Sequence, residues 1–240
     1  MPHRNNFLLR NLAPATLARI APHLAVVELQ QAEVLADTDQ RVQNVYFPHT
    51  GVISNVVELA SGDAIETGMI GNDGAFGANQ ALDDRLSLNR VVMQIGGSAS
   101  MMGSDRVCDF AAQLPDFREL LVKYEQFFLS QVQQTAACNA VHDVQARTCK
   151  WLLRMHDLAG VDLPLTQEFL AQMIGVRRSS VTDVAGELQK AGMISYSRGR
   201  IHIENIERIR ASACECDAED RSRYRRIFQC DDPTGVVLRA

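Results

Sequence analysis

The sequence predicts an α+β protein built from an antiparallel β domain, a long central helix and a C-terminal winged helix-turn-helix. Three observations support this prediction. Short β-rich runs between glycine and Asx turns fill the first hundred residues. No glycine or proline occurs from Asp116 to about Leu158, where apolar residues recur every three or four positions. Two short amphipathic segments and a hairpin pattern follow between Leu163 and Ile203.

The composition is that of an ordinary folded protein. Of the 240 residues, 46% are hydrophobic and 22% are charged, which excludes disordered and fibrous classes. No run approaches the roughly 20 consecutive apolar residues of a membrane span, and the first residues contain no signal-peptide pattern. We therefore expect a cytoplasmic protein with no membrane partner. The six cysteines lack the spacing of a secreted disulfide framework and are expected to be reduced thiols.

Charge is distributed unevenly along the chain. The net charge of −5 by itself argues against a nucleic-acid partner. However, residues 1–146 carry a net charge of −7, residues 147–210 carry +3 and residues 211–240 carry −1. The basic excess therefore coincides with the region of the two amphipathic segments and the hairpin.

The N-terminal part is expected to be mostly β after a short helix from about Ala15 to His23. Its β-rich runs include residues 45–47, 52–59, 65–70 and 90–95. Turn signals such as Ser61-Gly62-Asp63 separate these runs, and this spacing is typical of an antiparallel sandwich or barrel. Ser104 and Asp105 are expected to cap a short helix after the last strand.

The central stretch predicts a helix from Asp116 to Val141. Its repeating positions are Leu121, Tyr124, Phe128, Val132, Thr135, Asn139 and His142. At about 1.5 Å per residue the helix is about 40 Å long, which is more than a domain of this size needs for its own core. We therefore expect it to pair with a second copy of the chain. Packing of the helix on the β domain is the alternative.

The next stretch has the features of a helix-turn-helix. Thr166 is placed to cap a first helix, Ala171 allows a second helix to approach, and Gly175 suits the turn between them. The apolar positions that would bury the contact between the helices are Leu170, Ile174, Val176, Val181 and Val184. Gly192 is expected to end the second helix, and residues 193–203 then predict a β-hairpin with a basic tip, which is a wing.

Polar and basic side chains gather at the start of the second helix and on the wing, where this motif contacts DNA. The candidate DNA-binding residues are Thr166, Gln167, Arg177, Arg178, Ser179, Ser180, Thr182, Asp183, Arg198 and Arg200. The planar fork of arginine matches two acceptors of guanine, and the wing arginines are expected to contact phosphates. A solvated charged face is the alternative, but the coincidence of charge, helix start and wing favours DNA.

This layout resembles the Crp/Fnr family of bacterial regulators, which contains the cyclic-AMP receptor protein and the fumarate-nitrate regulator. The resemblance covers residues from about 10 to 210 and is most specific over Leu165–Val181 and the Gly192–Ile203 wing. Asp143–Arg147 also resembles the family. The implied parts are a β-roll of the cyclic-nucleotide-binding jelly-roll type (1–112), a dimerisation helix (113–146), a winged helix-turn-helix (147–212) and a tail (213–240). The family resemblance implies a homodimer that binds a two-fold operator in double-stranded promoter DNA and contacts RNA polymerase.

The chain departs from the family in its effector segment. Cyclic-nucleotide binders of the family carry a Gly-Glu segment for the ribose and an Arg-Ser pair for the cyclic phosphate, and the corresponding stretch here lacks both. Without them the buried phosphate charge would be uncompensated. The candidate effector residues are Gly71, Asn72, Asp73, Gly74 and Arg90. A different small-molecule effector, or none, is favoured over a cyclic nucleotide held by Arg90. An N-terminal iron–sulfur cluster is not expected, because the first cysteine is Cys108.

A second departure lies in the recognition helix. Arg178 matches the family's base-reading arginine, but Ser179 and Asp183 stand where members with the familiar half-sites have glutamate and arginine. Serine and aspartate have different hydrogen-bonding capacities, so the operator is expected to differ from the well-known ones.

The tail contains Cys214 and Cys216, with Cys230 beyond an expected amphipathic helix that carries Tyr224, Ile227 and Phe228. Two thiols one residue apart suit a soft metal or an oxidant sensor, but two cysteines do not complete a zinc site and no histidine neighbours them in the sequence. Incidental thiols on a packed segment are favoured, so no metal site is predicted.

Catalysis has no support in the sequence. No serine-nucleophile elbow, P-loop, dinucleotide fingerprint or His-Glu-x-x-His occurs, so neither catalytic residues, an enzyme nor a cofactor is predicted. The sequence therefore predicts a homodimeric DNA-binding transcription regulator. The alternatives are a cyclic-nucleotide-responsive regulator that uses Arg90, and a small-molecule-binding module in which DNA binding is secondary.

Overall fold

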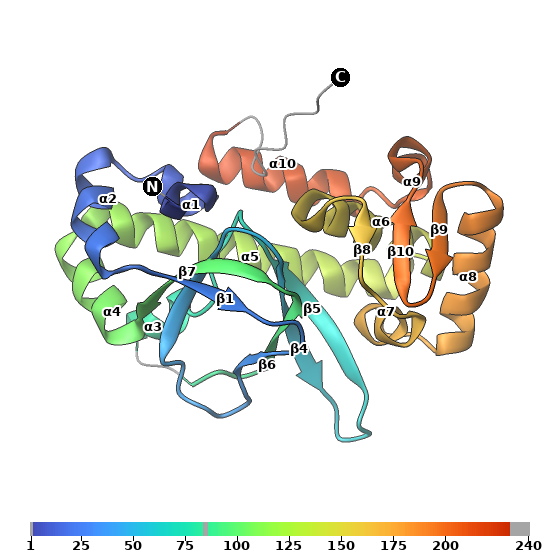
Figure 1. The fold of residues 1–240 in the computed structure, drawn as a ribbon, viewed down its shortest axis with the longest axis horizontal. Helices are drawn as coiled ribbons and strands as arrows, with labels where there is room; N and C mark the ends of the chain where they lie inside the picture. The colour runs from blue at the N-terminus through green and yellow to red at the C-terminus, as the bar shows by residue number, and fades with distance from the viewer. Residues whose placement is uncertain (1, 84–85, 231–240) are drawn as a thin grey trace.

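The long helix α5 (Pro115–Val141) organises the molecule. In the computed structural model, which describes residues 2–83 and 86–230, a β-roll lies along one side of α5, and the winged helix-turn-helix lies beyond its C-terminal end (Figure 1). The last ten residues of the predicted tail, 231–240, lie outside the described residues. Within the described part of the chain, no helix is both long and apolar enough to cross a membrane.

The β-roll consists of two antiparallel sheets, as the sequence predicts. One sheet has the strand order β1-β7-β3 and the other has the order β2-β6-β4-β5. The strands are β1 (Ala25–Leu29), β2 (Val34–Ala36), β3 (Asn44–Pro48), β4 (Val52–Glu58), β5 (Ala64–Ile70), β6 (Arg90–Ile95) and β7 (Gly97–Gly103). Val45, Phe47, Ile53 and Met93 are fully buried between the sheets, so the inward positions of both sheets form one core.

Short helices surround the roll. They are η1 (Pro2–Asn5), α1 (Phe7–Arg10), α2 (Pro14–Ile20), η2 (Ala21–His23), α3 (Ala78–Asp83) and α4 (Ser104–Gln113). The predicted leading helix corresponds to α2 and η2, whereas the two preceding helices were not expected. Buried Asn6 explains α1, because its side chain caps this helix and donates to the carbonyls of Pro48 (3.0 Å) and Gly74 (2.8 Å). The predicted cap of α4 is wrong, since Gly103 is the N-cap and the Ser104 hydroxyl donates to the Val42 carbonyl at 2.8 Å.

Helix α5 matches the predicted helix within one residue, but its predicted repeat, apart from exposed Asn139, is buried or half-buried. Leu121 and Tyr124 are buried in the core shared with the β-roll, as the alternative interpretation expects. A different stripe of α5 is exposed and follows a four-three spacing. Its members are Val122, Gln126, Leu129, Gln133, Ala136 and Ala140. The face open to a partner is therefore not the face that the periodicity singles out.

The chain breaks between α5 and α6 (Val144–Ala159) even though no glycine or proline is present. His142 is extended, with φ −100° and ψ 147°, and the Asp143 side chain accepts a hydrogen bond from the Ala146 amide at 2.8 Å. An aspartate N-cap thus starts a new helix and redirects the chain into the DNA-binding part.

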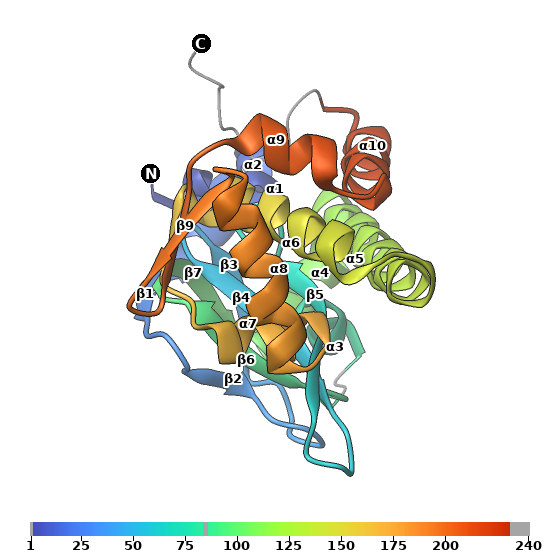
Figure 2. The same cartoon turned by 90° about the vertical axis from the view of Figure 1, so that its right-hand side faces the viewer.

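The remaining elements form the winged helix-turn-helix and a helix that returns along α5. They are β8 (Asp162–Leu163), α7 (Gln167–Ile174), α8 (Arg178–Lys190), β9 (Ile194–Ser197), β10 (Arg200–Ile203), α9 (Ile206–Ser212) and α10 (Cys216–Phe228). The predicted amphipathic tail helix is confirmed as α10, which lies beside α5 (Figures 1 and 2). Its Tyr224 is buried against Phe127, with ring centroids 4.7 Å apart, and its hydroxyl donates to the Asp73 carbonyl at 2.6 Å.

Candidate DNA-binding surface and effector cavity

The two helices of the helix-turn-helix begin and turn where the sequence predicts. The Thr166 hydroxyl accepts a hydrogen bond from the Phe169 amide at 3.1 Å and caps α7. Gly175 ends α7 in the left-handed region with φ 69°, a conformation that glycine adopts without steric cost. Buried side chains from α7 and α8 then join the helices. These are Leu170, Ala171, Ile174, Val181, Ala185 and Leu188.

Burial of one face of α8 leaves its other face to solvent. Arg177, Arg178, Ser179, Thr182 and Asp183 are exposed, and Ser180 is half-buried. All six lie at or near the N-terminal end of α8, the end that reads bases in this motif. The packing of the helix thus presents the predicted residues together.

Contacts between α7 and α8 hold two of the candidate side chains. Arg178 pairs with Glu168 at 3.2 Å, and the Thr182 hydroxyl donates to Gln167 Oε1 at 3.0 Å. The first pair is largely exposed, so it contributes at most about 1 kcal/mol and can be exchanged for another partner. The role of Glu168 is not visible in the sequence, because the pair forms only when α7 packs against α8.

The wing is a β-hairpin of β9 and β10, as predicted, and β8 adds a third strand. Arg198 and Gly199 form its tip with φ values of 48° and 75°, and Arg198 and Arg200 are exposed. The backbone amide of Gln167 donates to the Tyr196 hydroxyl at 3.2 Å, which connects the wing to the start of α7. Tyr196 is a second residue whose role the sequence did not reveal.

The back of the helix-turn-helix docks on the β-roll. Helix α7 packs against both α8 and β5 (Figure 2). The Arg147 guanidinium donates to the Ile174 carbonyl at the end of α7, and the Ser54 hydroxyl lies 3.6 Å from the Met173 sulfur. These contacts link α6, α7 and β4, so the β-roll and the helix-turn-helix part share one interface.

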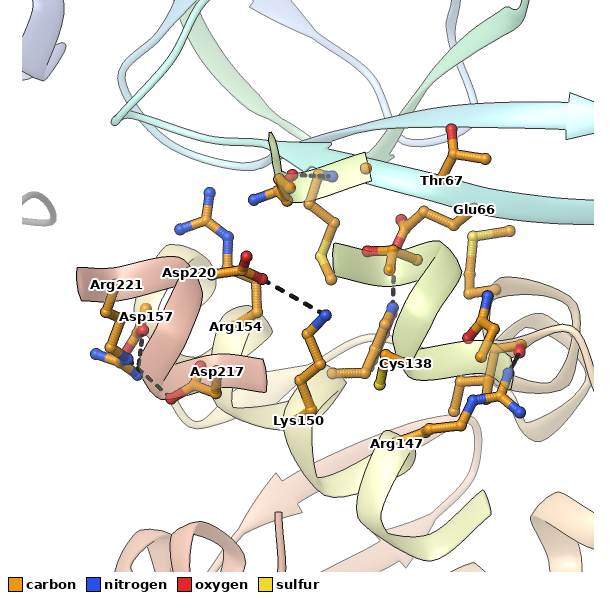
Figure 3. A pocket seen from close by; sticks show the side chains of 18 of the residues that line it. Glu66, Thr67, Cys138, Arg147, Lys150, Arg154, Asp157, Asp217, Asp220 and Arg221 are labelled. Carbon is orange, nitrogen blue, oxygen red and sulfur yellow. Dashed lines mark hydrogen bonds and ion pairs between the residues drawn. The ribbon is translucent and has the colours of Figure 1, made fainter. Parts of the chain in front are cut away.

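Buried charged groups lie within this interface, the junction of the β-roll with α6 and α7 (Figure 3). Glu66 accepts hydrogen bonds from Ser54 and from the Trp151 indole, the latter at 2.9 Å. Burial raises the pKa of Glu66 from 4.5 to about 7, although both hydrogen bonds oppose the shift. Arg154 pairs with Asp73 at 2.7 Å. Burial disfavours the charged form of Arg154, but the attraction of Asp73 is stronger and raises the pKa of Arg154. A cavity of about 80 Å³ remains between these groups.

A larger cavity of about 700 Å³ lies where the β-roll meets α3 and α5. Its wall is mostly apolar and includes Ile70, Phe76, Val91 and Leu129. None of the described residues that line it is a lysine or arginine. Its one charged member within the described chain is Glu125, whose pKa burial raises to about 7. An anionic ligand would find no cationic partner among these residues.

The predicted effector residues border this cavity without lining it. Ile70 and Ala75 flank the Gly71–Gly74 segment and line the wall, as do the two neighbours of Arg90. The segment itself packs elsewhere, because Asp73 pairs with Arg154 and a side chain at Gly74 would collide with the Tyr124 ring. Arg90 pairs with Glu58 at 3.3 Å on the surface.

The cysteines of the tail have neighbours that the sequence spacing does not show. No histidine is near Cys214 and Cys216 in the sequence, but the fold brings both thiols next to Cys138 and His142 at the end of α5. The local signal for this group is the spacing of Cys138 in the last turn of α5 and His142 directly after it.

Comparisons with known proteins agree with this architecture. Residues 146–212 match the Crp-like helix-turn-helix domain family. A crp/fnr-family transcriptional regulator from Eubacterium rectale is similar in structure, with 14% identity, 85% of this chain and 96% of that chain covered, and a TM-score of 0.68. FixK2 from Bradyrhizobium japonicum is 14% identical, with 80% of this chain and 98% of that chain covered and a TM-score of 0.67. A CRP-family regulator from Thermus thermophilus is 18% identical, with 78% of this chain and 96% of that chain covered and a TM-score of 0.64. No curated protein sequence matches. The predicted resemblance is thus confirmed for the fold and for the helix-turn-helix domain.

Proposed function

We propose that this chain, a regulator of the Crp/Fnr type by its fold and its Crp-like helix-turn-helix domain, binds a two-fold promoter operator as a homodimer. The observation that carries the proposal is the exposed start of α8, which presents Arg177, Arg178 and Ser179 while the opposite face is buried. A cytoplasmic regulator of this kind acts beside RNA polymerase. No group in the described sites calls for an enzymatic reaction.

Base reading is assigned to α8 and phosphate contact to the wing. Arg178 exchanges its exposed pair with Glu168 for the two acceptors of a guanine. Ser179 and Asp183 occupy the neighbouring reading positions, which supports an operator different from the familiar family palindrome. Arg198 and Arg200 contact phosphates and make binding dependent on salt. Thr166 caps α7, and the Gln167 backbone amide holds the wing through Tyr196.

Dimerisation is assigned to the exposed stripe of α5. Val122 and Leu129 are 48% and 57% exposed, one heptad apart, and small alanines continue the stripe toward the C-terminal end. A second copy of the same stripe would bury these side chains in a two-fold interface. The two recognition helices would then enter successive major grooves about 34 Å apart.

An effector is assigned to the larger cavity. Val122, Gln126 and Leu129 belong both to the cavity wall and to the dimer stripe, so a ligand bound there contacts the residues that meet the partner helix. The apolar wall and buried Glu125 favour a neutral or cationic apolar molecule over a cyclic nucleotide. Arg90, whose use defines the cyclic-nucleotide alternative, is engaged with Glu58 and lies outside the wall.

Selection of duplexes from a random pool tests the DNA-binding proposal. Purified protein without added nucleotide, at fixed moderate salt, is expected to enrich a palindrome. Arg178→Ala should weaken binding to that palindrome by about 5- to 150-fold, corresponding to about 1–3 kcal/mol per bidentate base contact. Arg106→Ala, an exposed arginine on α4, is the matched control and should bind normally. Equal binding by both variants would favour the small-molecule module in which DNA binding is secondary.

Two further measurements test the dimer and the effector class. Leu129→Glu should convert a dimer to a monomer in light scattering, because it places a charge in the centre of the stripe. A monomeric wild-type protein would contradict the dimer. Calorimetric titration with cyclic AMP and cyclic GMP is expected to show no saturable heat, and saturation that is lost in Arg90→Ala would restore the cyclic-nucleotide alternative.

A further inference from the structure

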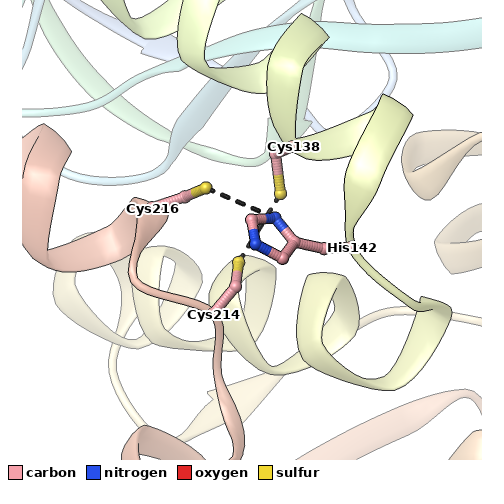
Figure 4. Close-up of side chains that lie close together, drawn as sticks. All are labelled: Cys138, His142, Cys214 and Cys216. Atoms are coloured by element: carbon pink, nitrogen blue, oxygen red, sulfur yellow. Dashed lines mark hydrogen bonds between the residues drawn. The ribbon is translucent and has the colours of Figure 1, made fainter.

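Three thiols and one imidazole meet where α5 ends and α10 begins. Cys138 lies in the last turn of α5, and His142 is the residue directly after this helix. Cys214 lies in the link after α9, and Cys216 is the first residue of α10. Their four potential ligand atoms all lie within 4.8 Å of one another (Figure 4). None of these residues belongs to the DNA-binding surface or to the effector cavity described above.

Local structure explains why two distant segments supply the four groups. His142 directly follows the last turn of α5, and its backbone amide donates to the Cys138 carbonyl, so the two residues lie together at the end of the helix. His142 then leaves the helix in an extended conformation, which turns its ring toward the tail. The single residue Glu215 separates the other two thiols, and the packing of α10 on α5 through Tyr224 and Phe127 holds that link in place.

The separations between the groups match those around one tetrahedral ion. The Cys138 and Cys214 sulfurs are 3.5 Å apart, and the Cys216 sulfur lies 3.6 Å from His142 Nδ1. Zinc–sulfur bonds of about 2.3 Å and zinc–nitrogen bonds of about 2.0 Å give tetrahedral edges of about 3.8 Å for two sulfurs and about 3.5 Å for sulfur and nitrogen. These two separations therefore nearly match the spacing that a single ion requires, and all four atoms lie within 4.8 Å of one another.

Neighbouring side chains orient the groups as in known metal sites. His142 Nε2 lies 3.2 Å from the Glu215 carboxylate, which leaves Nδ1 directed toward the thiols. A carboxylate that holds the far nitrogen of a ligating histidine fixes the ring and raises its basicity. The Gln134 amide donates to the Cys216 sulfur at 3.1 Å, a contact that stabilises a thiolate. These are two observations independent of the clustering itself.

Burial separates the site from competing ligands. Cys138, Cys214 and Cys216 are buried, and 21% of the His142 side chain is exposed. Three thiols and one imidazole fill a tetrahedral shell, so no position remains for a substrate. Such closed sites stabilise structure rather than catalyse a reaction.

We propose that Cys138, His142, Cys214 and Cys216 bind one divalent, thiophilic, tetrahedral ion of the zinc class. Binding releases up to three thiol protons to solvent, and no electron transfer is involved. The ion joins the start of α10 to the end of α5, next to the point where α6 departs toward the DNA-binding part. Loss of the ion is therefore expected to loosen the packing of α10 on α5 and, through α10, its packing on α6.

The metal content of the full chain tests this proposal. Protein expressed with zinc in the medium and purified without chelators or a histidine tag should retain about one zinc per chain by mass spectrometry. Replacement by cobalt(II) should give the intense visible absorption of a tetrahedral cobalt–thiolate site. Glu215→Gln changes an exposed side chain and should weaken zinc affinity by about 10- to 100-fold without unfolding the protein.

Ligand variants and matched controls locate the site. Cys216→Ser and His142→Ala should lose the metal, whereas His142→Cys keeps four ligands and should retain it. Cys108→Ser, an exposed thiol on α4, and Cys149→Ser, a buried thiol on α6, should both retain one zinc. Loss of zinc from the control variants as well would contradict the assignment.

Three results would overturn the proposal. The first is folded wild-type protein that binds neither zinc nor cobalt when these are supplied at stoichiometric concentration. The second is a disulfide between Cys138 and Cys214 in freshly isolated, metal-free protein, which would make the cluster a redox pair. The third is iron with acid-labile sulfide, which would replace a single ion by a cluster.

Discussion

The exposed surface of the helix-turn-helix and the junction behind it use the same type of ion pair under opposite conditions. On the surface, 67% of the Arg178 side chain and 74% of Glu168 are exposed. At the junction, 16% of Arg154 and 2% of Asp73 are exposed. An exposed pair contributes about 0–1 kcal/mol, whereas removing one partner of a buried pair leaves an uncompensated charge.

The two ion pairs therefore differ in how easily their partners can be exchanged. The surface pair can open toward a base at little cost, because water replaces the lost contact. The junction pair lies between the β-roll and α6 and holds their relative position, so it resists exchange. The pair that can change partners is thus exposed, and the pair that holds the two parts together is buried.

Removal of the junction arginine should give the largest effect. Arg154→Met leaves Asp73 buried without a counter-charge and is expected to lower the free energy of unfolding by about 3–5 kcal/mol. Urea denaturation followed by the fluorescence of Trp151, the single tryptophan, measures the change at the junction itself.

Two variants sharpen this result. Arg178→Met removes an arginine from the exposed pair and should change stability by less than about 1 kcal/mol. The double variant Asp73→Asn/Arg154→Met removes both buried charges and should recover most of the loss. Equal effects of Arg154→Met and Arg178→Met would show that burial does not distinguish the two pairs.

Glu66 should make the junction sensitive to pH. Its pKa is about 7 in the folded chain and 4.5 as the ordinary value, so between these values the unfolded state ionises while the folded state stays protonated. The contribution of Glu66 to the free energy of unfolding is therefore fully present below a pH of about 4.5. It falls by about 3 kcal/mol as the pH rises to about 7 and is constant at higher pH. Glu66→Gln should remove this decrease, which urea titrations at several pH values would measure.

The surroundings of Glu66 make the test specific. Lys150 and Arg154 face it from α6 and favour the charged form, but burial dominates. Glutamine keeps an acceptor for the Trp151 indole and offers a donor to Ser54, so packing is preserved. Glu125→Gln serves as comparison, since its pKa is also about 7 but it lies in the cavity wall. An unchanged pH profile in Glu66→Gln would assign the dependence to other groups.

Features set by short stretches of sequence were predictable. The Thr166 cap, the Gly175 turn and the wing follow from residues a few positions apart, and the structure confirms each. Helix α5 was predicted within one residue for the same reason. In the candidate surface, the exposure of Arg177 and Arg178 follows from the apolar spacing of α8, whereas their effect on DNA affinity stays a prediction.

Features that depend on contacts between distant segments were not predictable. Glu66 has an ordinary sequence context, and only the docking of α6 on β5 buries it beside Trp151. The α5 repeat has two apolar faces, and one chain does not show which face its own β-roll covers. Cys138 and Cys214 are likewise separated by 76 residues and meet only because α10 returns along α5.

The smallest effect is expected at the surface pair. Glu168→Gln frees Arg178 from its internal partner and should change the free energy of unfolding by less than about 1 kcal/mol. DNA affinity should rise by at most about fivefold, since the arginine no longer exchanges one charge for another. Binding isotherms on the selected palindrome measure this gain. Glu187→Gln removes an exposed acid near the other end of α8 and controls for net charge. If both variants tighten binding equally, charge alone acts, and the pair with Glu168 does not restrain Arg178.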